Sequence, residues 1–198
     1  MDFEVNSSNP AVRAIIEGRA PKPAKLAAAR GILPIAHGDL LEVLVALTSD
    51  PEQELADLAK STLLSQDPVA LQSVLGSDEA APRVLDFYSR IENLPDAALE
   101  SILTNSKTPD GSIAGFARST KSGHLLELIA FNQQLLIRTP SVIDAIINNP
   151  FRTAEAERRA AETKREFFEK ERGAQQIANE LRAQGKEAAA EFIEGSEF

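Results

Sequence analysis

A short phrase of apolar residues, closed by a polar residue and a proline, recurs between residues 94 and 151. In each copy three apolar residues at positions i, i+3 and i+4 precede the polar residue, a spacing that predicts one apolar face of a helix. The copies are Leu99, Ile102, Leu103 and Asn105 before Pro109; Leu126, Ile129, Ala130 and Asn132 before Pro140; Ile143, Ile146, Ile147 and Asn149 before Pro150; and a fainter one, Leu71, Val74, Leu75 and Ser77 before Pro82. A single helix of this kind has too little apolar surface to fold alone, so we expect neighbouring copies to pack on one another.

Prolines and capping residues predict where the helices before Pro150 begin and end. The pattern predicts helices over about 10–17, 23–30, 39–48, 68–76, 80–92, 122–131 and 140–148, and further helices starting after Asp50-Pro51, at Pro95-Asp96 and at Pro109-Asp110. Asp39 is the expected N-cap of the helix over 39–48. Residues 133–138 are expected to form a tight connector rather than a helix.

The composition changes after Pro150. Residues 152–194 hold 19 charged side chains of both signs and no proline. Oppositely charged residues recur three or four positions apart, as in Glu162 with Arg165, which supports a solvent-exposed helix. We expect one long helix or two, with Gly173 and Gly185 as the candidate breaks.

Two stretches resemble known helical repeats. The phrase from Leu99 to Pro109 resembles the variant leucine-rich repeat, and the helix pair over 39–65, with Ser49-Asp50-Pro51-Glu52 at its turn, resembles a HEAT repeat. Together the resemblance covers roughly residues 38–153. Both families imply right-handed stacks of short helices that act as binding scaffolds, and neither implies a catalytic residue or a cofactor for this chain.

The predicted fold is therefore an all-α, right-handed α-solenoid of about four helix pairs with a long charged C-terminal helix. We expect an N-terminal helical cap over 1–37, a helical repeat domain over 38–151, and a charged C-terminal helix or helix pair over 152–198.

Composition removes several classes of function. The chain has no cysteine, which excludes disulfides, thiolate metal sites and cysteine nucleophiles. No run of about 18 apolar residues occurs, so no membrane-spanning segment is expected. The first residues, Met1-Asp2-Phe3-Glu4-Val5, lack the basic and apolar regions of a secretory signal. A cytoplasmic location is the resulting expectation.

Negative charge is concentrated in one part of the chain. The formal net charge is −9, and residues 39–110 alone hold four basic and fourteen acidic side chains. A surface of this sign repels phosphates and favours basic partners, although it could equally serve solubility alone. We expect the acidic residues at the turn after the helix over 39–48 to contact such a partner: Asp50, Glu52, Glu54 and Asp57.

Residues that could carry chemistry are few. His37 and His124 lie far apart in the sequence, each beside a glycine at a helix end, and no phosphate-binding glycine loop, serine elbow or metalloprotease motif occurs. We therefore predict a non-enzymatic protein with no metal and no cofactor. Asn105, Asn132 and Asn149 are expected to cap helices and, where buried, to bond backbone groups of an adjacent unit; a row of asparagines facing a ligand is the alternative.

Two aromatic residues in the charged C-terminal region form a second candidate contact. Phe167 and Phe168 are adjacent, so on a helix they point about 100° apart and cannot share one narrow apolar face. One could pack on the repeats while the other meets a partner, or both could pack on the last repeat. The region could also drive homo-oligomer formation through residues 152–194. Nucleic-acid binding by a helical-repeat platform is a further alternative, which the net negative charge disfavours.

Overall fold

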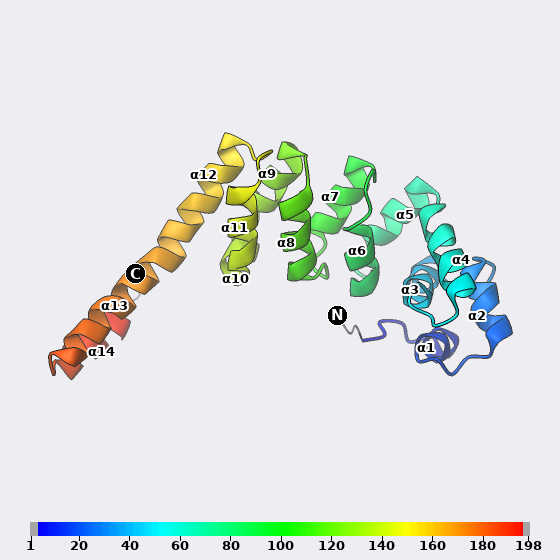
Figure 1. The fold of residues 1–198 in the computed structure, drawn as a ribbon, viewed down its shortest axis with the longest axis horizontal. Coiled ribbons are helices and arrows are strands. Elements are labelled where there is room, and N and C mark those ends of the chain that lie inside the picture. Colours follow the sequence, from blue (N-terminus) through cyan, green and yellow to red (C-terminus); the bar gives the residue numbers. More distant parts are fainter. Residues whose placement is uncertain (1–3, 196–198) are drawn as a thin grey trace. The chain divides into compact units, whose positions relative to one another are not determined.

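The computed structural model describes residues 4–195, and the regular secondary structure of this part of the chain is all helix, without a strand (Figure 1). It confirms the all-α class. The chain divides into two compact units, residues 1–116 and 117–198, which are described separately below.

Unit 1 contains the helices up to the middle of α8. They are α1 (Pro10–Ile16), α2 (Lys22–Ala29), α3 (His37–Leu47), α4 (Gln53–Leu64), α5 (Pro68–Leu75), α6 (Pro82–Tyr88), α7 (Asp96–Thr104) and α8 (Asp110–Ser119). Proline occupies the first position of α1, α5 and α6, where its missing N–H costs nothing. Asp67 caps α5 by accepting hydrogen bonds from two backbone N–H groups.

The core of unit 1 is built around α3. This helix packs against α1, α2, α4 and α6, while α5 packs against α7. Among the largest fully buried side chains are Leu41, Leu44, Leu63, Leu85 and Tyr88. Aliphatic side chains thus supply most of the buried surface, as the scarcity of aromatic residues predicts.

Two expectations about unit 1 are wrong in detail. Helix α3 begins at His37 after Ala36, so Asp39 lies in the first turn instead of at the N-cap. The carboxylate there still faces the positive end of the helix dipole. Helix α6 ends at Tyr88, well before residue 92, and Asn93 adopts a positive φ of 65° in the turn that follows.

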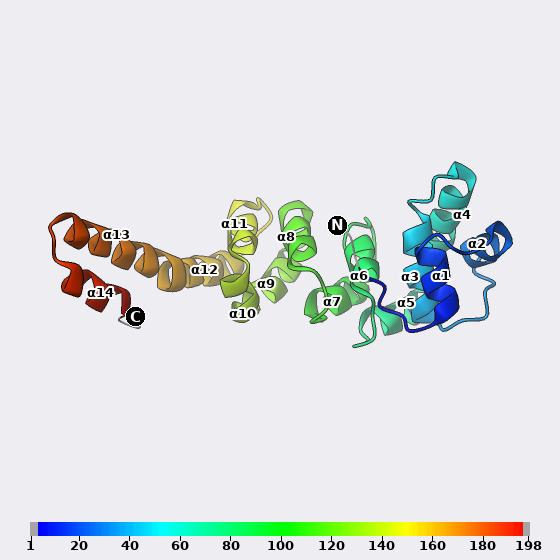
Figure 2. The same ribbon diagram turned by 90° about the horizontal axis from the view of Figure 1, so that it is seen from below.

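Unit 2 contains α9 (Gly123–Phe131), α10 (Gln133–Arg138), α11 (Pro140–Asn148), α12 (Ala154–Thr163), a π-helical turn η1 (Lys164–Glu169), α13 (Lys170–Ala183) and α14 (Glu187–Gly195). Helix α12 packs on α9, α10 and α11. Helices α13 and α14 lie side by side and pack on each other (Figure 2). Residues 154–163 therefore belong to the packed body of this unit.

The expected connector over 133–138 is a helix, because Asn132 caps it by accepting a hydrogen bond from the N–H of Leu135. Gly173 lies inside α13 and does not break it, whereas Gly185, with φ +74°, ends the helix before α14. Two of the residues that the repeated phrase places in the core, Leu103 and Ile129, are buried, and Ile147 is half-buried.

Candidate functional site

The four acidic residues singled out from the sequence fall into two groups. Asp50 and Glu52, in the turn between α3 and α4, form ion pairs with lysines of α2: Lys25 Nζ lies 2.8 Å from Asp50 Oδ2, and Lys22 Nζ lies 2.5 Å from Glu52 Oε1. The Asp50 side chain is only 10% exposed, so its charge is paired within unit 1 and is hardly accessible to a partner. Glu54 and Asp57, on α4, are exposed.

The pairing changes the ionisation of Asp50. The hydrogen bond from Lys25, together with one from the backbone N–H of Glu52, holds the pKa of the Asp50 carboxyl below its ordinary value. The carboxylate stays charged and fixes the turn before α4 against α2. Asp50 therefore helps to position α2 and α4. The acidic groups that a partner could reach lie elsewhere on the protein.

A polar cavity of about 580 Å³ lies in unit 1 beside the start of α3. It is formed by the N-terminal segment (residues 4–9), the first turns of α3, the end of α5 and the loop over 76–81. Its lining is Asn6, Ser7, Ser8, Ala36, Gly38, Asp39, Glu42, Ser73, Val74, Ser77, Glu79, Ala80 and Ala81. Three of these residues are acidic and none is basic. We call this space the acidic cavity.

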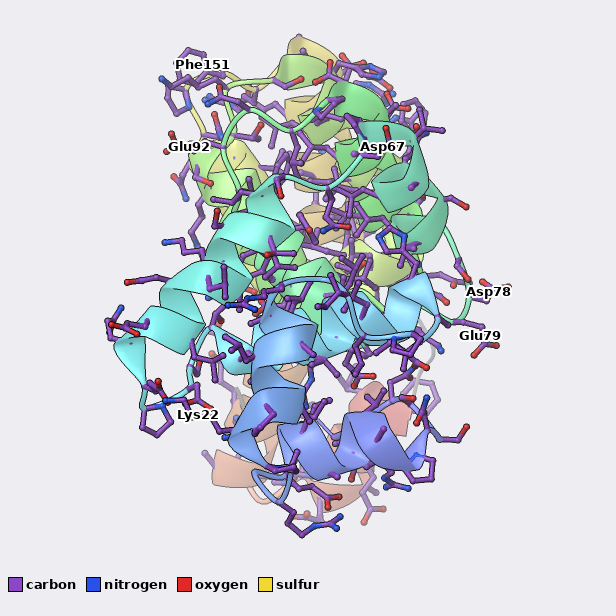
Figure 3. The ribbon with its side chains drawn as sticks, turned by 90° about the vertical axis from the view of Figure 1, so that its right-hand side faces the viewer. Lys22, Asp67, Asp78, Glu79, Glu92 and Phe151 are labelled. Atoms are coloured by element: carbon purple, nitrogen blue, oxygen red, sulfur yellow. The ribbon has the colours of Figure 1, made fainter. Side chains whose placement is uncertain are left out.

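The loop over 76–81 is held in place by Asn105, the C-cap of α7. Asn105 Nδ2 donates to the carbonyl oxygens of Leu75 at 2.9 Å and Ser77 at 3.0 Å, and Oδ1 accepts from the N–H of Lys107. The next residues in the loop, Asp78 and Glu79, project together from one edge of the unit (Figure 3). A fixed loop thus forms one side of the cavity.

Glu42 is the least exposed charged group of the cavity. Its side chain is 1% exposed, yet both carboxylate oxygens are used: Oε1 accepts from the N–H of Asn6 at 2.7 Å and Oε2 from the N–H of Ser7 at 3.1 Å. Arg83, on α6, places Nε 3.7 Å from Oε1. The carboxylate therefore joins three segments that are distant in sequence: the N-terminal segment, α3 and α6.

Sequence reasoning missed Glu42, although a signal was present. It is the one charged residue in the run Leu40-Leu41-Glu42-Val43-Leu44, and a carboxylate in an otherwise apolar stretch must find hydrogen-bond donors when the helix is buried. Glu79 and the N-terminal segment carried no such signal, because only the fold brings them to the cavity.

Asn149, in unit 2, repeats the bonding of Asn105. Its Nδ2 donates to the carbonyl oxygens of Ala117 at 2.8 Å and Thr120 at 2.9 Å, and its Oδ1 accepts from the N–H of Phe151. Asn132 instead caps the following helix. The expectation that these asparagines cap helices is thus met, and Asn105 and Asn149 also bond an earlier segment through their amides.

The two phenylalanines of the C-terminal region lie in the π-helical turn η1. Phe167 is 40% exposed and Phe168 is half-buried, as the different directions of adjacent side chains require. Two further apolar side chains, Ile177 of α13 and Phe192 of α14, are 50% and 74% exposed. The helix pair α13–α14 thus carries apolar surface that unit 2 leaves accessible.

The histidines occupy separate environments. His37 Nε2 lies 2.7 Å from Gln66 Oε1 in unit 1, and His124 is exposed near the start of α9 in unit 2. Within residues 4–195 the structure contains no group of three or more His, Cys, Asp or Glu side chains placed to hold a metal. None of the described helices has the length and apolar character needed to cross a membrane.

Comparison of the chain with models of protein families, with curated proteins and with solved structures gives no match. The class that the structure defines is accordingly that of an all-helical protein, and its function must be inferred from its own surfaces.

Proposed function

We propose that the protein is a non-enzymatic protein–protein interaction scaffold, a right-handed array of stacked helix pairs whose acidic surface over residues 39–110 binds a basic partner. The observation that carries the proposal is the acidic cavity. Asp39, Glu42 and Glu79 line it; Glu42 pairs with Arg83, whereas none of the described lining residues is a cation that could pair with Asp39 or Glu79. A lysine or arginine side chain would supply the missing charge and donate hydrogen bonds to the carboxylates and hydroxyls.

The repeated bonding of Asn105 and Asn149 supports the array. Each amide joins the end of one helix to carbonyl groups near the end of an earlier one, about 30 residues before. Interactions that recur at such a separation are what stacked repeats require.

Binding of a fluorescent, lysine-rich peptide tests the proposal. We expect association that weakens steeply as salt is added, because exposed charges are screened. The sharp comparison is between two double variants with equal changes in net charge: Asp39→Asn with Glu79→Gln in the cavity, and Glu54→Gln with Asp57→Asn on α4. The cavity variant should lose most of the affinity and the α4 variant little; equal losses would show that the peptide senses only net charge.

Self-association through the C-terminal region is a second candidate function, favoured by the exposed Phe167, Ile177 and Phe192. Packing these large apolar side chains against a second copy of the chain would remove them from water and so stabilise a dimer. The mass in solution, measured over a range of protein concentrations, should then rise. The double variant Ile177→Ser, Phe192→Ser should abolish the rise and the exposed control Gln175→Ser should not; a monomer at all concentrations rejects this candidate.

A further inference from the structure

A second cavity, of about 310 Å³, lies in unit 2 where the last turn of α8 meets one face of α11. Its lining is Arg118, Asp144, Ala145, Asn148 and Asn149. The last four follow the spacing i, i+1, i+4 and i+5, so they lie on one side of α11 and its C-cap. The volume is at the lower end of the range for small-molecule sites, which suits a small ligand better than a peptide. We call this space the α8–α11 cavity.

The two sides of the α8–α11 cavity are joined by Asn149. This side chain is 2% exposed, and its amide donates to the carbonyl oxygens of Ala117 and Thr120, which flank Arg118 in the sequence. The backbone that carries Arg118 is therefore fixed relative to the helix that carries Asp144. A ligand that contacts both sides would find them already in position, which lowers the entropic cost of binding.

Two opposite charges line the α8–α11 cavity without pairing with each other. Asp144 Oδ1 accepts from Lys164 Nζ at 2.9 Å, which leaves Oδ2 to accept from a further donor. The exposed Arg118 guanidinium has no hydrogen bond or ion pair with any other residue that the structure describes. Its N–H donors lie in one plane, and this geometry matches the two oxygens of a carboxylate.

A ligand that complements both groups must carry an anion and a cation close together. A simple carboxylate would pair with Arg118 and still face the charge of Asp144, whereas a simple amine would pair with Asp144 and face the charge of Arg118. A free α-amino acid carries a carboxylate and an ammonium on the same carbon atom. Its size also fits a cavity of about 310 Å³.

We propose that the α8–α11 cavity binds a free α-amino acid, with the ligand carboxylate on Arg118 and the ligand ammonium on Asp144. The site lies in unit 2, whereas the acidic cavity lies in unit 1, so this inference does not rest on the proposed function. A bound amino acid joins the end of α8 to α11 and stabilises the folded state of unit 2 by mass action.

Isothermal titration calorimetry of the full chain tests the ligand chemistry. The probes are glycine, serine, leucine and glutamate, each compared with its carboxamide, which lacks the α-carboxylate, and with its N-acetyl derivative, which lacks the ammonium. At least one free amino acid should bind, and either derivative of it should bind about tenfold more weakly or worse, because each lacks a hydrogen-bonded charge pair. An N-acetyl derivative that binds as tightly as the free amino acid overturns the proposal, as does the absence of binding by every probe at millimolar concentration.

Three exposed substitutions test the position of the site. Arg118→Gln should weaken binding of the free amino acid about tenfold or more, and Asp144→Asn should weaken it similarly without affecting the N-acetyl derivative. Lys121→Gln is the matched control, because it removes the same charge three residues after Arg118 but lies outside the lining. Binding to this control should equal binding to the wild type. Equal losses in Arg118→Gln and Lys121→Gln would show that the ligand senses only net charge and would overturn the site, whatever the lysine-rich peptide does at the acidic cavity.

Discussion

Asn105 and Asn149 make the same set of hydrogen bonds in different units of the protein. Each amide nitrogen donates to two carbonyl oxygens of an earlier segment, and each amide oxygen accepts from the N–H two residues ahead, Lys107 in one case and Phe151 in the other. One side chain thus satisfies three backbone groups that a turn leaves unpaired.

Replacement of Asn149 by alanine should lower the free energy of unfolding by about 2–4 kcal/mol, because the side chain is 2% exposed and its loss strands buried backbone groups. Urea-induced unfolding followed by circular dichroism measures the change. The adjacent Asn148 supplies a matched control: its amide bonds a single exposed carbonyl, so Asn148→Ala should change stability by no more than about 0.5 kcal/mol. Equal effects of the two substitutions would show that the buried hydrogen bonds contribute little.

The ion pair between Asp50 and Lys25 should stabilise unit 1 in a pH-dependent way. Asp50→Asn keeps the shape of the side chain but leaves Lys25, 19% exposed, without its charged partner, and should cost about 1–3 kcal/mol at neutral pH. Because folding lowers the pKa of Asp50, the contribution is present above the unfolded value of about 3.9 and is lost as pH falls through the folded value.

Unfolding experiments on the wild type and on Asp50→Asn at several pH values test this linkage. The difference in stability should be constant near neutrality and shrink below about pH 4. Glu54→Gln, an exposed acid on the neighbouring helix, should show a difference near zero throughout. A difference for Asp50→Asn that does not change with acidification would contradict the assignment.

Tyr88 is the single tyrosine of the chain and reports on the core directly. Its hydroxyl donates to the carbonyl oxygen of Leu63 at 2.9 Å, and burial raises the pKa of Tyr88 above its ordinary value. The ultraviolet absorbance of tyrosinate should therefore be absent from the folded protein at pH values where a free tyrosine ionises, near 10, and appear only when the core unfolds. Ionisation that follows the free-tyrosine curve while helical dichroism persists would contradict the burial.

Replacement of Tyr88 by phenylalanine tests the hydrogen bond separately. The aromatic ring keeps its packing against Phe87, while the carbonyl of Leu63, one of the last in α4, loses its donor. We expect a loss of about 1–2 kcal/mol in the free energy of unfolding. An unchanged stability would mean that water replaces the hydroxyl.

The sequence predicts the helices of this protein well where the signal is local. Pro68 after Asp67 marks the start of α5, and the spacing of Leu99, Ile102 and Leu103 marks the core face of α7. The helix over residues 133–138 is not predicted in this way, since six residues are too few to show a helical period; the side-chain cap from Asn132 marks its start.

The partners of the residues in the candidate site are harder to predict from the sequence. Asp50 is an acidic residue in a turn, as expected of a residue that contacts a basic partner. In the structure it pairs with Lys25, 25 residues away in the sequence, and no local pattern reveals this pair. Glu42 meets Ser7 across 35 residues. Local periodicity predicts which residues are buried, whereas the partners of a buried charge depend on which segments the fold brings together.

Gly123, the first residue of α9, marks a close approach within unit 2. A Cβ at this position would lie 2.8 Å from Thr153 Cγ2 and 3.1 Å from the carbonyl oxygen of Phe151, and Thr153 also caps α12 through its hydroxyl. Gly123→Ala should therefore displace this cap and cost about 1–3 kcal/mol.

Gly173 provides the opposite case in the same unit. It lies inside α13, and a Cβ there would meet no atom within 4 Å, so Gly173→Ala should stabilise the helix by about 0.5–1 kcal/mol through lower backbone entropy of the unfolded chain. Thermal unfolding of the two variants should shift in opposite directions relative to the wild type. A stabilising Gly123→Ala would show that α9 and the turn before α12 do not pack as closely as the structure has them, since the alanine would then gain helix propensity without a steric cost.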